Sequence, residues 1–244
     1  MKLLNFSVNA TICAFTSPST DYSERDLSIH QLLIGSSNSY TLLRVNSEHL
    51  DCNGVFNDSI LVIDKALKPT HNCLVVGYLD AELVIGYYNK HQQSLCSLSG
   101  NTTELPTFSF LEFQLLGVAT SVITPFVDCH IDPSPTDLDN LLVSDPNSSF
   151  VARVSGTSLE GRQVLDSDIV LVDRKLKPKH NDLIVANYNS SFVLKQLDVY
   201  NKALVSVDKD GHTKSTIIRP HDIFSIEGVI TFAIRSLCPT GFNI

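Results

Sequence analysis

Ser158 and Lys195 are the two residues of this chain whose types and setting could do chemistry together. A serine hydroxyl is a weak nucleophile until a neighbouring base removes its proton, and a lysine can be that base when its amine is neutral. Lowering the pKa of a lysine from about 10.4 to about 7 takes roughly 4.6 kcal/mol of differential desolvation. The pair therefore needs a turn that presents the hydroxyl and a buried position for the amine.

The segment around Lys195 can supply the buried position. Lys195 lies within SFVLKQL, where the alternation of a strand places it on the same face as Val193 and Leu197. A lysine that shares its face with two aliphatic side chains can lose much of its water. The alternative interpretation is an ordinary strand lysine that faces solvent.

The segment before Ser158 predicts a tight turn after a strand. Gly156 permits the backbone geometry of such a turn. The backbone N–H groups of Gly156, Thr157 and Ser158 could then point at a developing oxyanion. The alternative interpretation is a serine that serves only to form the turn.

The same pattern occurs twice in the chain at a constant offset of 109 residues. Residues 44–85 align on residues 153–194, with DSILVIDKALKPTHN over SDIVLVDRKLKPKHN. In the first copy, His49 stands where the second has Ser158, and Gly86 stands where the second has a lysine. The first copy therefore lacks both the nucleophile and the base.

The repeat predicts two all-β domains, residues 1–123 and residues 124–244. Short segments rich in β-branched residues alternate with turn residues in both halves, and helical periodicity is confined to LSIHQLLI and TDLDNLLV. A polar, proline-containing arm precedes the strands of each half. Such an arm cannot bury enough apolar surface to order alone, so it must dock on a folded body or move.

Composition narrows the class of protein. The 244 residues carry a net charge of −8 without a run of Lys or Arg, which argues against direct binding of nucleic acid. No segment approaches the length of a membrane span, and MKLLNFSVNATICAF is too interrupted for a secretory signal. Six cysteines without CxxC spacing favour free thiols, so we expect a cytoplasmic protein. Glycines of LLGVAT and IEGVIT, near the end of each copy, indicate a bulge or a close backbone approach.

The second copy resembles the catalytic core of the UmuD/LexA self-cleaving family. SGTSLEG followed by SDIVLVDRKLKPKHNDLIVANYNSSFVLKQL places Ser158 and Lys195 at the positions of that family's serine nucleophile and lysine base, with Leu159 where methionine is usual. The arm CAFTSPSTDYSERDLSIHQLLI is similar to the UmuD arm, with Cys13 and Ala14 at the bond that the family cleaves. The resemblance implies a doubled LexA/signal-peptidase β-clip fold with mobile N-terminal arms, and no cofactor or metal.

Departures from the family are complementary in the two copies. The copy without the catalytic pair keeps the better arm, whereas the second copy has Cys129 and His130 at its own arm site. We therefore expect an internal pseudo-dimer in which Ser158 attacks the Cys13–Ala14 bond.

The resemblance also implies partners. These are an error-prone translesion DNA polymerase and a RecA filament, in the SOS response to DNA damage. Two alternatives remain open: a non-catalytic interaction module or inhibitor that binds polymerase or RecA, and a LexA-like regulator that acts through a partner.

Overall fold

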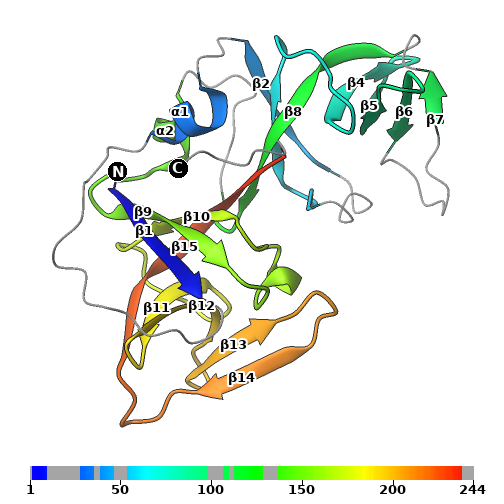
Figure 1. Cartoon of the computed structure of the whole chain (residues 1–244). Helices are drawn as coiled ribbons and strands as arrows, with labels where there is room; N and C mark the ends of the chain where they lie inside the picture. Colours follow the sequence, from blue (N-terminus) through cyan, green and yellow to red (C-terminus); the bar gives the residue numbers. More distant parts are fainter. Residues whose placement is uncertain are drawn as a thin grey trace. The chain divides into compact units, whose positions relative to one another are not determined.

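The computed structural model describes residues 2–9, 28–35, 39–46, 54–97, 107–109, 113–128 and 137–237. Within these residues the chain is almost entirely β-structure with two short α-helices, which confirms the expected all-β class (Figure 1). No helix in these ranges has the length and apolar character needed to cross a membrane. Four residues of the predicted cleavage sites, and the expected counterpart of the nucleophile, lie outside the described residues: Cys13, Ala14, Cys129, His130 and His49.

The chain divides into two compact units. Unit 1 consists of Met1–Ser28, Pro125–Cys129 and Asp139–Ile234. Unit 2 consists of Ile29–Thr124, His130–Leu138 and Arg235–Ile244. The first segment of the chain therefore belongs to the unit that contains Ser158 and Lys195.

Unit 2 is built on an antiparallel sheet with the strand order β2-β3-β8-β4-β5-β6-β7. Its buried side chains are mainly Val, Ile and Leu from β3 and β4 together with β8, which explains why these segments form central strands. The elements are α1 (Ile29–Ile34), β2 (Tyr40–Arg44), β3 (Ile60–Asp64), β4 (Leu74–Leu79), β5 (Glu82–Asn89), β6 (Ser94–Ser97), β7 (Thr107–Ser109) and β8 (Gln114–Pro125).

Unit 1 has the strand order β1-β9-β10-β15-β11-β12-β13-β14, and each pair is antiparallel except β1 with β9. One cluster of buried side chains lies under β9, β10 and β11, and a second joins β11, β12, β13 and β15. The elements are β1 (Lys2–Asn9), α2 (Leu138–Leu142), β9 (Ser149–Ser155), the 3-10 helix η2 (Glu160–Arg162), β10 (Ile169–Asp173), β11 (Leu183–Tyr188), β12 (Ser191–Asp198), β13 (Ala203–Val207), β14 (Thr213–Ile217) and β15 (Phe224–Ser236).

Equivalent turns of the two sequence copies share unusual backbone geometry. Asn72 has φ 63° and Asn181, 109 positions later, has φ 72°. Ala81 and Ser190 have φ 67° and 66°, again 109 positions apart. Positive φ is uncommon outside glycine, so this recurrence shows that the shared sequence pattern is accompanied by shared turn conformations.

The strand glycines near the end of each copy lie against a neighbouring backbone, as expected. A Cβ on Gly117 would lie 2.6 Å from the carbonyl oxygen of Asp64. A Cβ on Gly228 would lie 2.9 Å from that of Asp173. The ladders β4–β8 and β11–β15 each change register beside these positions. A side chain at either glycine would push the two strands apart.

Candidate active site

The turn that carries Ser158 follows β9 directly and is fixed by a carboxylate. Gly156 has φ 103°, a conformation that L side chains rarely adopt. Its backbone N–H donates to Oδ1 of Asp166 at 2.7 Å. This N–H is therefore engaged within the turn, and the N–H groups of Thr157 and Ser158 are the better candidates for binding an oxyanion.

Leu159 anchors the turn by burying its side chain in the core of unit 1. Its side chain is 2% exposed and packs in the same cluster as Val154 and Leu194. Its carbonyl oxygen accepts hydrogen bonds from the N–H groups of Arg162 at 2.8 Å and Val164 at 3.2 Å. Leucine thus fills the core position at which the UmuD/LexA pattern has methionine, and the adjacent Ser158 stays half-buried at the surface.

Strand β13 lies against the turn. The N–H of Val207, at the end of β13, donates to the carbonyl oxygen of Ser158 at 2.8 Å. Gly161 allows the close approach of η2, because a Cβ there would lie 2.2 Å from the carbonyl oxygen of Asp208. The backbone of Ser158 is therefore fixed to the end of β13.

Lys195 reaches the same part of β13 from the neighbouring strand. On β12 it pairs with Ile184 of β11, and Val193 and Leu197 pack in one cluster with Ile184, as the alternation of the sequence predicts. On the other side, Gln196 pairs with Val205. Continued by one residue, this register places Lys195 opposite Ser206. Ser206 directly precedes Val207, whose N–H binds the carbonyl oxygen of Ser158.

The surroundings of Lys195 lower the pKa of its amine from 10.5 to about 8. Burial is the larger cause, and the positive charge of Lys214 is the smaller. Lys214 pairs with Ser206 across β13 and β14, which places it in the same cross-strand row as Lys195. Among the described residues, no hydrogen bond joins the Lys195 amine to the Ser158 hydroxyl, although both adjoin the end of β13.

The equivalent position in unit 2 has no room for a lysine. Gly86 lies on β5 between Val75 of β4 and Ser97 of β6. A Cβ there would lie 2.6 Å from the carbonyl oxygen of Cys96 and 2.9 Å from Cγ of Leu95. The backbone of β6 therefore occupies the space that the side chain of a base at position 86 would need.

A strand that the sequence did not predict lies beside the Ser158 strand. β1 pairs in parallel with β9, with Lys2 opposite Phe150 and Asn9 opposite Ser155. It also contacts β12, the strand of Lys195. The sequence analysis treated this segment only as an interrupted apolar stretch, because pairing with a strand nearly 150 residues away leaves no local pattern.

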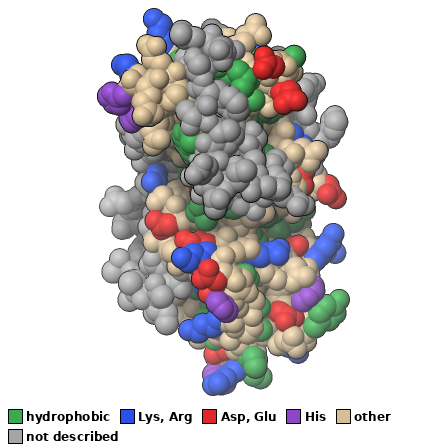
Figure 2. Space-filling model, turned by 90° about the vertical axis from the view of Figure 1, so that its right-hand side faces the viewer, with side chains coloured by type: hydrophobic (Ala, Val, Ile, Leu, Met, Phe, Trp, Pro, Cys, Tyr) green, Lys and Arg blue, Asp and Glu red, His purple; other side chains and the backbone are tan. Residues whose placement is uncertain are grey.

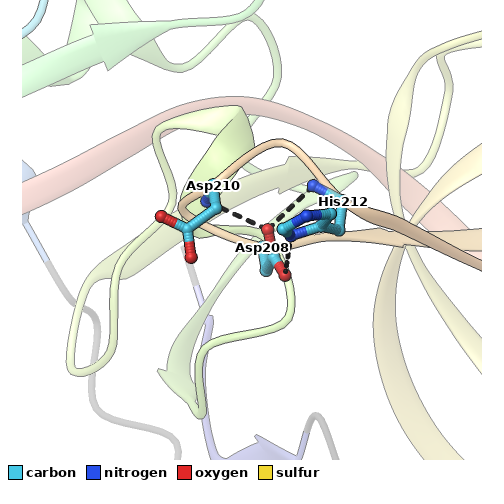
Figure 3. A group of neighbouring side chains, drawn as sticks. All are labelled: Asp208, Asp210 and His212. Carbon is cyan, nitrogen blue, oxygen red and sulfur yellow. Dashed lines mark hydrogen bonds and ion pairs between the residues drawn. The ribbon is translucent and has the colours of Figure 1, made fainter.

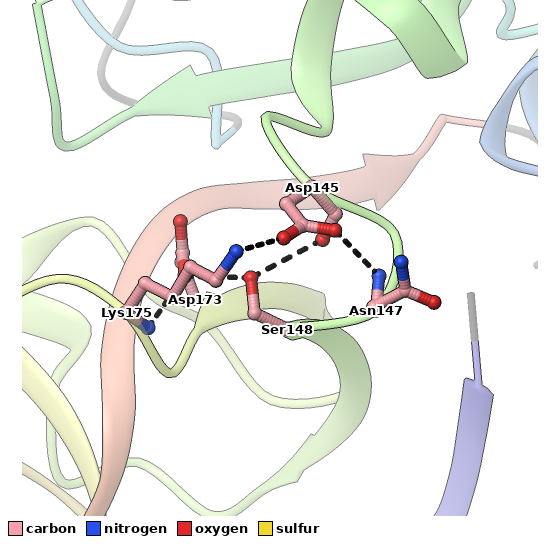
Figure 4. Close-up of polar contacts among 5 residues, drawn as sticks. All are labelled: Asp145, Asn147, Ser148, Asp173 and Lys175. Atoms are coloured by element: carbon pink, nitrogen blue, oxygen red, sulfur yellow. Dashed lines mark hydrogen bonds and ion pairs between the residues drawn. The ribbon is translucent and has the colours of Figure 1, made fainter.

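An ion-pair network holds the loop that enters β9 (Figure 4). Lys175 forms an ion pair with Asp145, and that hydrogen bond is the main cause that holds the pKa of Asp145 below its ordinary value. Oδ1 of Asp173 accepts from the Lys175 N–H at 2.7 Å and from the Ser148 hydroxyl at 3.3 Å. The network joins the end of β10 to the loop before β9 and so fixes the start of the strand that leads to Ser158.

The turn between β13 and β14 carries a cluster of three polar side chains (Figure 3). Potential ligand atoms of Asp208, Asp210 and His212 lie within 4.8 Å of one another, and Asp208 is the least exposed of the three. Oδ1 of Asp208 accepts from the N–H groups of Asp210 at 2.9 Å and His212 at 2.8 Å. These hydrogen bonds explain why the three side chains lie together: Asp208 holds the backbone of the turn.

Charge is mixed on the surface. On the face shown in Figure 2, basic side chains lie among acidic ones, and the whole chain has a net charge of −8. Among the described residues of that face, charge mixed in this way does not form the concentrated positive potential that binds phosphate backbones.

Comparison with known proteins finds similarity over the part of the chain that contains Ser158 and Lys195. A family model described as Peptidase S24-like matches residues 125–231. The protein ImpA of Salmonella typhimurium is 29% identical over 109 residues, which cover 45% of this chain and 75% of ImpA. The protein MucA of Escherichia coli is 34% identical over 61 residues, or 25% of this chain and 42% of MucA. A LexA repressor of Syntrophotalea carbinolica is 29% identical over 86 residues, or 35% of this chain and 43% of that repressor.

The S24-like match extends from the end of β8 into β15. It includes Ser158, Lys195 and the whole of β13, the strand that both residues adjoin. Over these residues the chain is similar to S24-like peptidases, and the similarity to ImpA, MucA and a LexA repressor supports the resemblance to the UmuD/LexA-type family.

Proposed function

We propose that the chain is a self-processing serine peptidase in which Ser158 is the nucleophile and Lys195 is the general base. The observation that carries the proposal is that the backbone of the half-buried Ser158 is bonded to the end of β13, while Lys195, whose amine has a pKa of about 8, lies on the neighbouring strand. At pH 7 such an amine is neutral in roughly one molecule in ten, against roughly one in three thousand at a pKa of 10.5. Burial thus raises the supply of competent base about three-hundredfold.

The proposed reaction is an acyl transfer. The neutral Lys195 amine takes the proton of the Ser158 hydroxyl while Oγ of Ser158 bonds to the carbonyl carbon of the scissile peptide. The N–H groups of Thr157 and Ser158 stabilise the resulting oxyanion. When the peptide bond breaks, the Lys195 ammonium returns the proton to the leaving amine, and water then hydrolyses the Ser158 ester. The chemistry uses no metal and no cofactor.

The proposed substrate is the Cys13–Ala14 bond of the chain's own arm. The described strand β1 ends at Asn9, opposite Ser155, only four residues before Cys13. Four residues of extended chain span at most about 14 Å, and the three residues from Ser155 to Ser158 at most about 11 Å. The two lengths are compatible with the Cys13–Ala14 bond reaching Ser158, and Cys129–His130 stays the second candidate.

The proposed architecture is a duplication within one chain. Residues 1–123 form an arm and a domain in which His49 and Gly86 replace the catalytic pair, and residues 124–244 form the catalytic domain. Support comes from the turns that recur 109 positions apart and from the assignment of Met1–Ser28 to the unit of Ser158. One chain would then supply both the substrate arm and the site that cleaves it.

The proposed setting is the SOS response, in which the chain would assist an error-prone polymerase in the cytoplasm after cleavage promoted by a RecA filament. Similarity to MucA and to a LexA repressor supports this setting. Binding of DNA would be left to these partners, consistent with the mixed surface charge.

Mass spectrometry of the purified chain at pH 7 to 10 tests the enzymatic proposal. We expect a fragment of residues 1–13 in the wild type and none in Ser158→Ala or Lys195→Ala. The variant Lys209→Gln, which removes an exposed charge from the β13–β14 turn, serves as the matched control and should cleave normally. An intact Cys13–Ala14 bond in the wild type at every pH, with and without RecA filaments, would refute the proposal.

A further inference from the structure

Strand β1 is added to a sheet that is complete without it. The S24-like match begins at residue 125, so residues 2–9 lie outside the part of the chain that matches the family. Parallel neighbours are normally joined by one crossover connection, whereas the chain between β1 and β9 contains all of the strands of unit 2. β1 therefore occupies the edge of β9 in the way that a separate peptide adds to a sheet.

The edge of β9 needs a cover. On its other side β9 pairs with β10 from Ser149 to Arg153. Phe150, Val151 and Ala152 are at most 2% exposed. A strand of such apolar residues with one open edge presents unpaired backbone groups to any extended chain.

The register of β1 directs the chain toward the Ser158 turn. Ser7, Val8 and Asn9 pair with Arg153, Val154 and Ser155 in unbroken order. From this last pair, three residues of one segment lead to Ser158 and four residues of the other lead to Cys13. The contact of β1 with β12 places the segment beside the strand of Lys195 as well.

We propose that the edge of β9 is a peptide-binding site for an extended segment in parallel register, and that residues 2–9 are its ligand. Backbone pairing at this edge selects the arm and sets which bond reaches Ser158. Once the Cys13–Ala14 bond is cut, the fragment of residues 1–13 is held by this pairing alone and can exchange with the same segment of a second copy. This regulatory step rests on the proposed function, whereas the peptide-binding site does not.

The binding test uses the full chain with Ser158→Ala, so that no cleavage occurs. Consecutive residues of a strand direct their N–H groups to opposite sides, and β9 is the strand with which β1 pairs within the described residues. Of Ser7→Pro and Val8→Pro, one therefore removes a hydrogen bond to β9, while the other removes an N–H that faces away and is tolerated at an edge. The two variants are matched controls for each other.

The probe is a fluorescent peptide of residues 1–12, followed by anisotropy, with a scrambled peptide of the same composition as the control. We expect it to bind one of the two proline variants about tenfold more tightly than the Ser158→Ala parent, because loss of one or two net backbone hydrogen bonds frees the edge. Equal binding to both variants and to the parent, or equal binding of the scrambled peptide, would overturn the proposal.

A second experiment tests the register in the active chain. Insertion of two residues between Asn9 and Cys13 should move the cut two residues toward the N-terminus of the original bond or slow cleavage at least about tenfold. Unchanged cleavage at Cys13–Ala14 would mean that the bond is recognised by its own sequence and would overturn the role of β1. The peptide can bind even if the chain never cleaves itself, so failure of the proposed function and failure of this site give different results.

Discussion

The pH dependence of self-cleavage should report the pKa of Lys195. With a pKa of about 8, the rate should rise nearly tenfold per pH unit between pH 6 and 7.5 and level off above about pH 9. An amine in water would instead give a rise that continues to about pH 10.5. The assay is the first-order appearance of the 1–13 fragment in buffers of constant ionic strength.

Removal of the Lys214 charge should move this profile to higher pH. A positive neighbour disfavours a second positive charge, so Lys214→Gln raises the pKa of Lys195. Burial is the larger of the two causes of a total lowering of about 2.5 units, so Lys214 accounts for less than half of it. The midpoint should therefore rise from about 8 to no more than about 9.3, and the rate at pH 7 should fall by no more than about twentyfold.

The matched control for this experiment is Lys209→Gln, which removes an equal charge from the exposed turn of the same hairpin. Its charge is not among the causes of the Lys195 shift, so its midpoint should stay near that of the wild type. A wild-type midpoint near 10.5, or an equal shift in the two variants, would refute the assignment of Lys195 as a base desolvated by its surroundings.

Three stability predictions follow from the same contacts, each measured by chemical denaturation. Lys195→Met should raise the free energy of unfolding at pH 7 by about 1–2 kcal/mol. The full pKa shift corresponds to roughly 3.4 kcal/mol, and the lower value allows for the partial exposure of the amine. Because the pKa of Lys195 is lower in the folded than in the unfolded chain, its charged form destabilises the fold, so the gain should be full below about pH 8 and vanish toward pH 10.5. Leu159→Ala should cost about 2–5 kcal/mol, whereas Leu159→Met should cost less than about 1.5, and equal losses would contradict the buried position of this side chain. Gly86→Ala should cost about 1–3 kcal/mol because its Cβ meets the Cys96 carbonyl, and a neutral result would show that β6 yields easily.

Local sequence pattern was sufficient for the parts of the fold that repeat at short range. Alternating β-branched residues predicted the strands on both sides of the site, and brief apolar periodicity predicted the helical turns that became α1 and α2. The alternation around Lys195 also placed Val193 and Leu197 on its face, because the period of a strand is two regardless of its partners.

Features that depend on distant partners could not be predicted. The sequence offered the Gly156 N–H for an oxyanion, yet Asp166, ten residues later, accepts its hydrogen bond. The second cause of the lowered Lys195 pKa is Lys214, which lies two strands away in the sheet. Each of these contacts is set by sheet order, and residues in sequence do not reveal which strands will be neighbours.

The difference between Lys195 and Gly86 argues that the two copies have diverged beyond exchange of two side chains. At position 195 the register leaves space in which a long side chain is partly buried, whereas at position 86 the carbonyl oxygen of Cys96 already lies 2.6 Å from where a Cβ would be. Gly86→Lys would therefore have to displace β6 before its side chain could be accommodated. Restoring chemistry to unit 2 requires a shift of backbone, so the proposed division of labour, with one catalytic unit and one that is not, is fixed by packing as well as by residue type.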